Sequence, residues 1–402
     1  MTKYIVLVGD GMADYPIESL GMRTPLEAAR TPNMDFMAKN GCLGQAKTIP
    51  ERMTAASDVA NLSILGYDPK KYYSGRGPLE AANLGIELED DDVVFRCNLI
   101  TAGGDILLDY SAGHIKSKEA SSLIKFIDQK LGNNKLHFFP GVSYRHLLLV
   151  KRGAELKLQN LKCWAPHDIV GLSIKRHLPK GDSADIIIKL MLDSKEILES
   201  HEINHVRLDL KENPGNMIWL WGQGVKPNMP KFMDKFGLSG SVISAVDLIK
   251  GLGHILGLGV INVPGATGYY DTDYAGKAKA AIKSLKKNDF VFVHVEAPDE
   301  AGHNGDLREK LTAIERFDQL VVGSFLEYCQ DKDDFRMMVL PDHATPLALK
   351  THTSEAVPFA IYGKNIQAGS FLNYSEKEAK KSQLYFEQGY QLMEYLILNT
   401  RR

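Results

Sequence analysis

Short runs of consecutive apolar residues alternate with helix-like segments along most of the chain. YIVLVG (4–9) is apolar throughout, which predicts a strand that is buried on both faces. Later apolar runs predict further strands at 216–222, 289–296 and 335–342. The run at 250–263 predicts the end of a helix followed by a strand. Helices are predicted between them, at 274–288 and 309–331. This alternation predicts an α/β fold with a mostly parallel sheet that helices cover on both faces.

Two more helices are predicted close to the first strand from the residues at their ends. The first begins after Thr31, has Pro32 at its first position and ends at Gly41, and each of these residue types is favoured at its place. The second covers 57–67 and has Ser57 at its N-terminus.

The stretch 86–212 differs in texture from the sequence on either side. It opens with the acidic run LEDDD, contains strand-like and helix-like segments, and ends near the polar turn KENPGN. We therefore predict a smaller α/β domain at 86–212, inserted into a core that is formed by 1–85 and 213–402.

Composition places the chain among ordinary globular proteins and excludes some partners. Apolar residues make up 44% and charged residues 24% of its 402 residues, and the formal charge is −2. Without a basic field, nucleic acid is not expected as a partner. Neither a signal peptide nor a membrane-spanning run is evident, and the four cysteines form no CxxC motif. These features predict a cytoplasmic protein with reduced thiols and no membrane partner.

Aspartate and histidine residues lie just after three of the predicted strands, or in the loop that follows the last of these strands. They are Asp10, Asp299, His303, Asp342, His343 and His352. Each alone also fits a polar surface. However, ligands of parallel sheets bind at the carboxyl ends of the strands, where these residues would meet. Carboxylates bind Mg²⁺ and Mn²⁺, and imidazole shifts the preference toward Mn²⁺, Zn²⁺ or Co²⁺. We predict a site for two divalent metals that performs phosphoryl chemistry.

Three hydroxyl residues near the first strand are candidates for the nucleophile: Thr54, Ser57 and Ser63. Ser57 is preferred because it opens a helix, where free N–H groups and the helix dipole stabilise an alkoxide and a phosphate. The alternative, that Ser57 only caps this helix, is equally compatible with its position.

Eight longer motifs resemble the alkaline phosphatase superfamily, and most closely the 2,3-bisphosphoglycerate-independent phosphoglycerate mutases of the archaeal type. They are VGDGMAD, TAASDVANLSILGYDP, YYSGRGPLEAANLGI, DYSAGHI, WLWGQG, GATGYYDTDY, HVEAPDEAGHNGD and LPDHATP. The resemblance spans essentially the whole chain, including the predicted insert. It implies an alkaline-phosphatase-like core with the insert as a substrate domain that closes over it.

The resemblance also assigns roles to individual residues. One metal would be held by Asp299, His303 and His352, and the other by Asp10, Asp342, His343 and the oxygen of Ser57. Ser57 would be transiently phosphorylated. Mn²⁺ is the expected ion, with Mg²⁺, Co²⁺ and Zn²⁺ left open.

Four further residues resemble substrate-handling positions of the family. His114 would touch the phosphoryl group or transfer protons, and Arg76, Arg145 and Lys250 would contact an anionic substrate. A helix cap for His114 and solvated surface positions for the arginines are the alternatives.

The implied reaction is the interconversion of 3-phosphoglycerate and 2-phosphoglycerate in glycolysis and gluconeogenesis, through phosphoserine. A homoserine kinase-like phosphotransferase, a phosphatase or phosphodiesterase, and a catalytically silent metal-binding protein are the alternatives. The sequence has no GxxxxGK[ST] loop, which argues against an ordinary ATP-dependent kinase. The expected partner is a small phosphorylated substrate, and both monomer and oligomer remain open.

Overall fold

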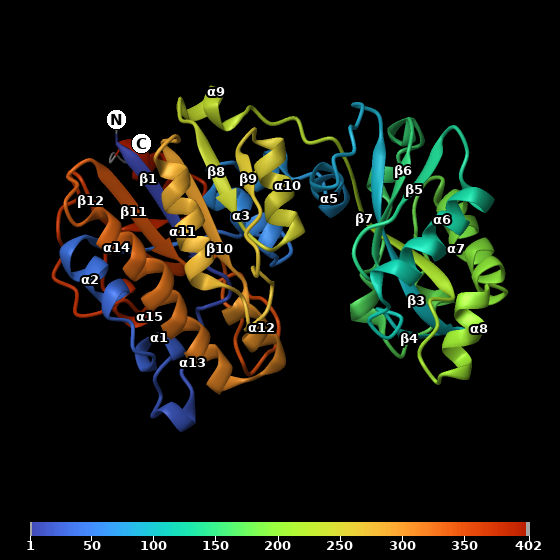
Figure 1. Ribbon diagram of the computed structural model, residues 1–402, viewed down its shortest axis with the longest axis horizontal. Coiled ribbons are helices and arrows are strands. Elements are labelled where there is room, and N and C mark those ends of the chain that lie inside the picture. Colours follow the sequence, from blue (N-terminus) through green and yellow to red (C-terminus); the bar gives the residue numbers. More distant parts are fainter. Residues whose placement is uncertain (1, 399–402) are drawn as a thin grey trace. The chain divides into compact units, whose positions relative to one another are not determined.

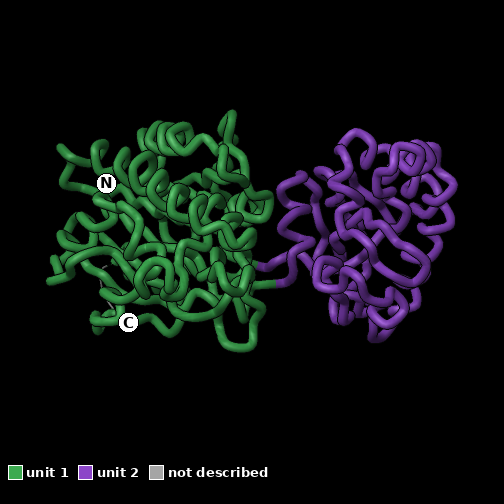
Figure 2. Tube along the Cα trace, turned by 90° about the horizontal axis from the view of Figure 1, so that it is seen from below, with its two compact units in different colours: residues 1–73, 229–402 green, residues 74–228 purple. Residues whose placement is uncertain are grey.

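The structure, a computed structural model, describes residues 2–398 and divides into two compact units. Unit 1 comprises residues 1–73 and 229–402, and unit 2 comprises residues 74–228 (Figure 2). Both boundaries lie outside the predicted limits of the insert, 86 and 212. The reason is that helix α5 (Arg76–Asn83) and strand β7 (Met217–Val225) pack against β3 (Val93–Gly103), within unit 2.

Unit 1 is built on an eight-stranded sheet in the order β13-β2-β12-β11-β1-β10-β8-β9 (Figure 1). The strands are β1 (Lys3–Gly9), β2 (Cys42–Ala46), β8 (Gly240–Ile243), β9 (Gly259–Ile261), β10 (Phe290–Val295), β11 (Phe335–Leu340), β12 (Val357–Gly363) and β13 (Tyr385–Phe386). β1 lies between β10 and β11 and runs parallel to both. β12 is the exception to the parallel arrangement of this sheet, because it runs antiparallel to its two neighbours, β11 and β2. The predicted mostly parallel sheet is confirmed.

Helices cover both faces of this sheet (Figure 1). Ile5 and Leu7 of β1 are buried against α2, α11, α13 and α14, whereas Val6 and Val8 point to the opposite face, on which α3, α10 and α16 lie. The helices of unit 1 are α1 (Pro25–Ala28), α2 (Pro32–Asn40), α3 (Ser57–Ile64), α4 (Pro69–Tyr72), α9 (Phe232–Phe236), α10 (Asp247–Ile255), α11 (Tyr274–Leu285), α12 (Ala297–Asn304), α13 (Leu307–Arg316), α14 (Gly323–Cys329), α15 (Glu376–Ala379) and α16 (Gln391–Leu398).

One sequence prediction for unit 1 is confirmed and another is corrected. The segment 250–263 contains the end of α10 followed by the short strand β9, as predicted. The helix predicted at 309–331 is divided by a π-helical segment, Phe317–Val322, between α13 and α14. Asp318 in that segment accepts hydrogen bonds from the first turn of α2, which accounts for a carboxylate buried at this point.

Unit 2 has a five-stranded sheet in which every pair is antiparallel. The remaining elements are β4 (Ile106–Asp109), β5 (Leu136–Phe139), β6 (Arg145–Val150), α6 (Ser117–Leu131), α7 (Ala184–Glu199) and α8 (Glu202–Asp209). Residues of α6 and α7 share a core with Val93, Phe95 and Cys97 of β3, and α5 packs on the other face, near Val94. The strand predicted at 216–222 is β7 of this sheet and not part of the parallel sheet, since it pairs with β3.

Among residues 2–398, none of the helices combines the length and the apolar character that crossing a membrane would require.

Candidate metal centre

Three neighbouring strands of unit 1 bring the predicted aspartates to one edge of the sheet. Asp10 directly follows β1, and Asp342 lies two residues beyond β11. Asp299 lies in the first turn of α12, which follows β10, and His303 is one turn further along the same helix. All three carboxylates are buried. The sheet topology therefore assembles them as the sequence predicts.

The first ligand group consists of Asp299, His303 and His352. Nε2 of His303 lies 3.2 Å from Oδ2 of Asp299, and Nε2 of His352 lies 3.4 Å from Oδ1. The two Nε2 atoms are 2.8 Å apart. Ligand atoms that sit about 2.1 Å from one ion lie roughly 3.0–3.5 Å from each other, so the two distances to Asp299 fit a shared cation, and the two Nε2 atoms lie slightly closer than that.

The second nitrogens of these two rings decide where their protons lie. Nδ1 of His303 is 3.0 Å from the carbonyl oxygen of Lys350, and Nδ1 of His352 is 3.3 Å from that of Ala55. A carbonyl oxygen only accepts, so each Nδ1 carries a proton and each neutral ring has a bare Nε2. Two bare nitrogens at 2.8 Å repel each other unless a proton or a cation lies between them.

The second ligand group consists of Asp10, Asp342, His343 and Ser57. Nε2 of His343 lies 3.1 Å from Oγ of Ser57, 3.4 Å from Oδ1 of Asp10 and 3.6 Å from Oδ2 of Asp342. Both carboxylate oxygens of Asp10 are buried and lack a donor with good hydrogen-bond geometry among the described residues, although Nε2 of His294 lies 3.1 Å from Oδ2. A buried carboxylate without donors is costly unless a cation binds it.

Asp342, in contrast, is oriented by three donors. The backbone N–H groups of Gly11 and His343 donate to Oδ1 at 3.2 and 2.9 Å, and Nδ2 of Asn61 donates to Oδ2 at 2.7 Å. Asn61 lies one turn beyond Ser57 in α3 and also donates to the carbonyl oxygen of Ser57. The same amide side chain therefore positions the helix that carries Ser57 against a carboxylate of the group.

Ser57 is the first residue of α3, and the N-cap position belongs to Ala56. Its hydroxyl group consequently makes no cap hydrogen bond and faces His343 instead. Of the other two candidates, Thr54 is exposed and Ser63 is fully buried in the last turns of the helix. Ser57 is thus the candidate hydroxyl that the structure places with the predicted ligands.

The electrostatics of the site also fit cations. Burial, together with the negative charges of Asp342 and Asp299, raises the pKa of Asp10 well above its usual value. Burial and the charge of Asp299 do the same for the pKa of Glu296. Burial alone would raise the pKa of Asp299, but its histidine partners hold that pKa well below the usual range. The residues present therefore fit two divalent cations, which would compensate the surplus of buried acids.

We expect metal binding to strengthen as the pH rises toward 9. Burial lowers the pKa of His303, but the hydrogen bond to Asp299 raises it to about 9. Below that pH the ring is protonated in the metal-free protein and must release its proton before Nε2 can bind an ion. The apparent affinity for Mn²⁺ should therefore rise by about tenfold per pH unit above pH 7 and level off near pH 9.

Titration calorimetry in buffers of different ionisation enthalpy measures the number of protons released. About one proton per bound ion near pH 7 is expected for the first ligand group. Binding that releases no proton at this pH would contradict the assignment of His303.

Sequence reasoning missed two residues of the site, His294 and Glu296. His294 is the fifth residue of β10, and its Nε2 lies 3.1 Å from Oδ2 of Asp10. Burial lowers the pKa of His294 to about 4. Glu296 lies with Asp10 and Asp299 in one cluster of carboxylates. Polar residues at the end of an otherwise apolar strand were the available signal.

The predicted substrate contacts fall in different units. Lys250 lies on α10 of unit 1, whereas His114, Arg76 and Arg145 belong to unit 2. His114 is exposed in the turn after β4, has a φ of 51°, and faces the ring of Tyr144 at 6.1 Å. Since α6 begins at Ser117 with its N-cap at position 116, His114 does not cap it.

Arg76 and Arg145 form a cationic cluster with Arg96, which sequence reasoning missed because it lies inside a strand. The Arg96 guanidinium is buried, pairs with Glu80 at 2.9 Å and covers the ring of Trp221 at 4.4 Å. Burial and the charges of Arg76 and Arg145 lower its pKa to about 10. Three guanidinium groups this close together favour an anion.

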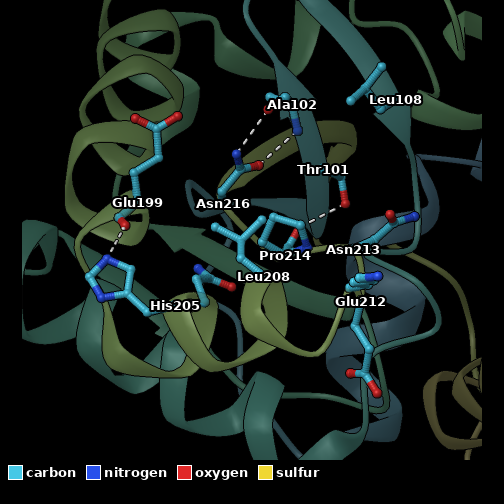
Figure 3. A pocket seen from close by; sticks show the side chains of 12 residues that line it. Thr101, Ala102, Leu108, Glu199, His205, Leu208, Glu212, Asn213, Pro214 and Asn216 are labelled. Atoms are coloured by element: carbon cyan, nitrogen blue, oxygen red, sulfur yellow. Dashed lines mark hydrogen bonds between the residues drawn. The ribbon is translucent and has the colours of Figure 1, made fainter.

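A pocket of about 580 Å³ in unit 2 lies elsewhere, beside α8 and the end of β3 (Figure 3). None of the residues that line it was predicted as a site residue. Its inner polar groups are already paired, since Asn216 bonds with the backbone of Ala102 and Thr101 donates to the carbonyl oxygen of Pro214 at 2.7 Å (Figure 3). The pocket is therefore no part of the predicted chemistry.

Comparisons with known proteins agree with the resemblance. A profile of the family described as 2,3-bisphosphoglycerate-independent phosphoglycerate mutase matches residues 38–204. A mutase of that description from Methanosarcina mazei is 54% identical over 363 residues, which are 90% of each chain. A solved protein from Pyrococcus horikoshii is 30% identical, with a TM-score of 0.84 over 100% of this chain and 98% of the other. The cofactor-independent phosphoglycerate mutase from Thermoplasma acidophilum is 27% identical, with a TM-score of 0.68 over 99% of both chains.

Proposed function

The chain belongs to the family of 2,3-bisphosphoglycerate-independent phosphoglycerate mutases, which are isomerases, and we propose that it interconverts 3-phosphoglycerate and 2-phosphoglycerate through a phosphorylated Ser57. The observation that carries this proposal is the position of the Ser57 hydroxyl group, 3.1 Å from Nε2 of His343 and at the start of a helix. The proposed reaction is a step of glycolysis and gluconeogenesis. The cytoplasmic location and the preference for Mn²⁺ stay predictions.

The ligand groups hold the ions in this proposal: Asp299, His303 and His352 for one, and Asp10, Asp342, His343 and Ser57 for the other. Bound divalent ions would neutralise the phosphoryl oxygens and lower the pKa of the Ser57 hydroxyl group. The first turn of α3 adds the positive end of the helix dipole, which favours the negative charge of the phosphoryl group.

The transfer consists of two displacements at phosphorus. Oγ of Ser57 loses its proton and attacks, a Ser57–phosphorus bond forms, and the bond between phosphorus and O3 of the substrate breaks, so that O3 takes up a proton and glycerate results. Glycerate then turns, its 2-hydroxyl group loses its proton and attacks phosphorus, and the Ser57–phosphorus bond breaks, so that Oγ regains a proton. Each step makes and breaks one O–P bond, so neither water nor an external bisphosphate is consumed. Water must be excluded meanwhile, because it would turn the enzyme into a phosphatase.

We assign the retention of glycerate to unit 2. The cluster of Arg76, Arg96 and Arg145 supplies the positive charge that a carboxylate needs, and Arg binds carboxylates with two parallel hydrogen bonds. His114, which carries its exposed ring beside Tyr144, is the proposed contact to the phosphoryl group during transfer.

Replacing Arg145 by Ala should lower kcat/KM for 3-phosphoglycerate by about 10- to 100-fold, mainly through KM, since a charged hydrogen bond contributes about 1.5–3 kcal/mol. Steady-state kinetics measure this. Arg152→Ala is the matched control, because Arg152 is exposed in the same unit and pairs with Glu155. If the KM of Arg145→Ala equals that of the control Arg152→Ala, Arg145 takes no part in substrate binding.

The proposed activity is tested by following 2-phosphoglycerate formation with enolase, with Mn²⁺ and without 2,3-bisphosphoglycerate. We expect turnover that a chelator abolishes. Release of inorganic phosphate in place of 2-phosphoglycerate would identify a phosphatase. Transfer to added homoserine without mutase turnover would identify the kinase-like alternative.

A further inference from the structure

One threonine contacts both ligand groups of the candidate metal centre. Thr345 lies in the loop after β11 and is fully buried. Its Oγ1 donates to Oδ1 of Asp299, in the first group, and lies 3.2 Å from Nδ1 of His343, in the second.

The single proton of the hydroxyl group determines the state of both partners. Asp299 must be ionised to bind a cation, and an ionised carboxylate only accepts hydrogen bonds. The Thr345 proton therefore goes to Asp299, and Oγ1 can only accept from Nδ1–H of His343. A neutral ring with its proton on Nδ1 has a bare Nε2. That atom faces Ser57 at 3.1 Å and Asp10 at 3.4 Å.

The backbone of Thr345 is fixed by hydrogen bonds on both its carbonyl oxygen and its N–H group. Nζ of the fully buried Lys310 donates to the carbonyl oxygen of Thr345 at 2.8 Å and to Oδ2 of Asp14 at 2.6 Å. The backbone N–H of Thr345 donates to the carbonyl oxygen of Ala13 at 3.2 Å. These contacts fix the backbone on which the hydroxyl group depends.

Gly11 closes the remaining space around Oγ1. A Cβ at this position would lie 2.6 Å from Oγ1 of Thr345 and 2.7 Å from Asp299, and the φ of 62° at Gly11 also favours glycine. The loop after β1 therefore packs directly on the hydroxyl group and its acceptor.

We propose that Thr345 is a positioning residue that fixes the ring nitrogen with which His343 binds its ion and orients the carboxylate of Asp299 for the other ion. The inference rests on the metal centre of the proposed function. Loss of the hydroxyl group alone should weaken metal binding at both ligand groups, because each loses the partner that orients one of its members.

The test compares Thr345→Val, which keeps the shape and removes the hydroxyl group, with Thr345→Ser, which keeps the hydroxyl group. We expect Val to lower the affinity for Mn²⁺ by about 10- to 100-fold and Ser to retain it within about threefold. Titration calorimetry measures both values. The visible absorption of bound Co²⁺ should shift in the Val variant only, because ligand orientation changes there.

Thr101→Val is the matched control for loss of a buried threonine hydroxyl group. Thr101 donates one hydrogen bond to the carbonyl oxygen of Pro214 in unit 2 (Figure 3), so its loss should cost stability and leave metal affinity unchanged. If Thr345→Val binds Mn²⁺ like the wild type, or if Ser and Val lose affinity equally, the inference is wrong. A wild type that binds no divalent ion would contradict the metal centre itself.

A second measurement tests the inference on the wild-type protein, even if the Thr345→Val variant does not fold. In the wild-type protein loaded with Zn²⁺, ¹⁵N resonances of the histidine rings report which nitrogen carries the proton. We expect His343 with the proton on Nδ1 and a metal on Nε2. A proton on Nε2 would overturn the role of Thr345.

Discussion

Replacing Ser57 by Ala should abolish mutase turnover, by about 10⁴-fold or more, while both ligand groups still bind metal. The proposed reaction passes its phosphoryl group through Oγ of Ser57. The other two candidates for the nucleophile, Thr54 and Ser63, do not lie with the predicted ligands. Six other side chains of the two ligand groups remain after the substitution, so the affinity for Mn²⁺ should fall by less than about tenfold. Enolase-coupled kinetics and titration calorimetry measure the two quantities.

Ser63→Ala is the control for this prediction. Ser63 lies on the same helix, is fully buried, and its Oγ makes no hydrogen bond to the described residues, so its removal should leave turnover unchanged. Turnover of Ser57→Ala within about tenfold of the wild type would exclude Ser57 as the nucleophile, since nucleophile removal has far larger effects.

Replacing Asp10 by Asn should change activity and stability in opposite directions. Turnover should fall by about three orders of magnitude, because a ligand of the phosphoryl-binding ion loses its charge. The metal-free protein should become more stable. Burial and neighbouring acids raise the pKa of Asp10 above its value in the unfolded chain, so the ionised carboxylate opposes folding at every pH above that value. The amide removes this cost.

The free energy of unfolding of metal-free Asp10→Asn should exceed that of the wild type at pH 7, because the raised pKa of Asp10 makes its ionised carboxylate oppose folding there. This gain should disappear below about pH 4, where the unfolded carboxylate is also protonated. Denaturant unfolding of the metal-free protein measures it. Asp331→Asn serves as control, because Asp331 is an exposed carboxylate of unit 1, away from both ligand groups, and its replacement should leave the free energy of unfolding unchanged. Lower stability of metal-free Asp10→Asn would contradict the electrostatic account.

The grouping of the candidate metal ligands was largely predictable because these residues follow strands that can be recognised locally. Asp10 and Asp342 end apolar runs that are buried on both faces, and parallel strands necessarily bring their carboxyl ends to one edge. The spacing of Asp299 and His303 predicted one helix face, and α12 provides it.

The residues that escaped prediction act through contacts that distant segments create. His294 and Arg96 lie within apolar strands, where their neighbours in sequence indicate only burial. Thr345 matters because Lys310 of α13, Gly11 after β1 and Asp299 of α12 all converge on it.

The fold was predictable in class but not in the assignment of every strand. An apolar run such as 216–222 indicates a strand without indicating its partner, and β7 pairs with β3 of unit 2 across more than a hundred residues of sequence. Short strands such as β8 carry too few residues for a pattern and are recognised only by their pairing with β10.

The central claim is that Ser57 carries the phosphoryl group between the two positions of the substrate. Acid quenching of the Mn²⁺ enzyme during turnover, followed by trypsin digestion and mass spectrometry, tests it directly. The tryptic peptide 53–70 contains Thr54, Ser57 and Ser63, so fragmentation separates all three candidates. We predict phosphate on Ser57, dependent on substrate and absent from Ser57→Ala. Phosphate on Thr54 or Ser63, or an unmodified peptide from enzyme quenched at full turnover, would contradict the claim.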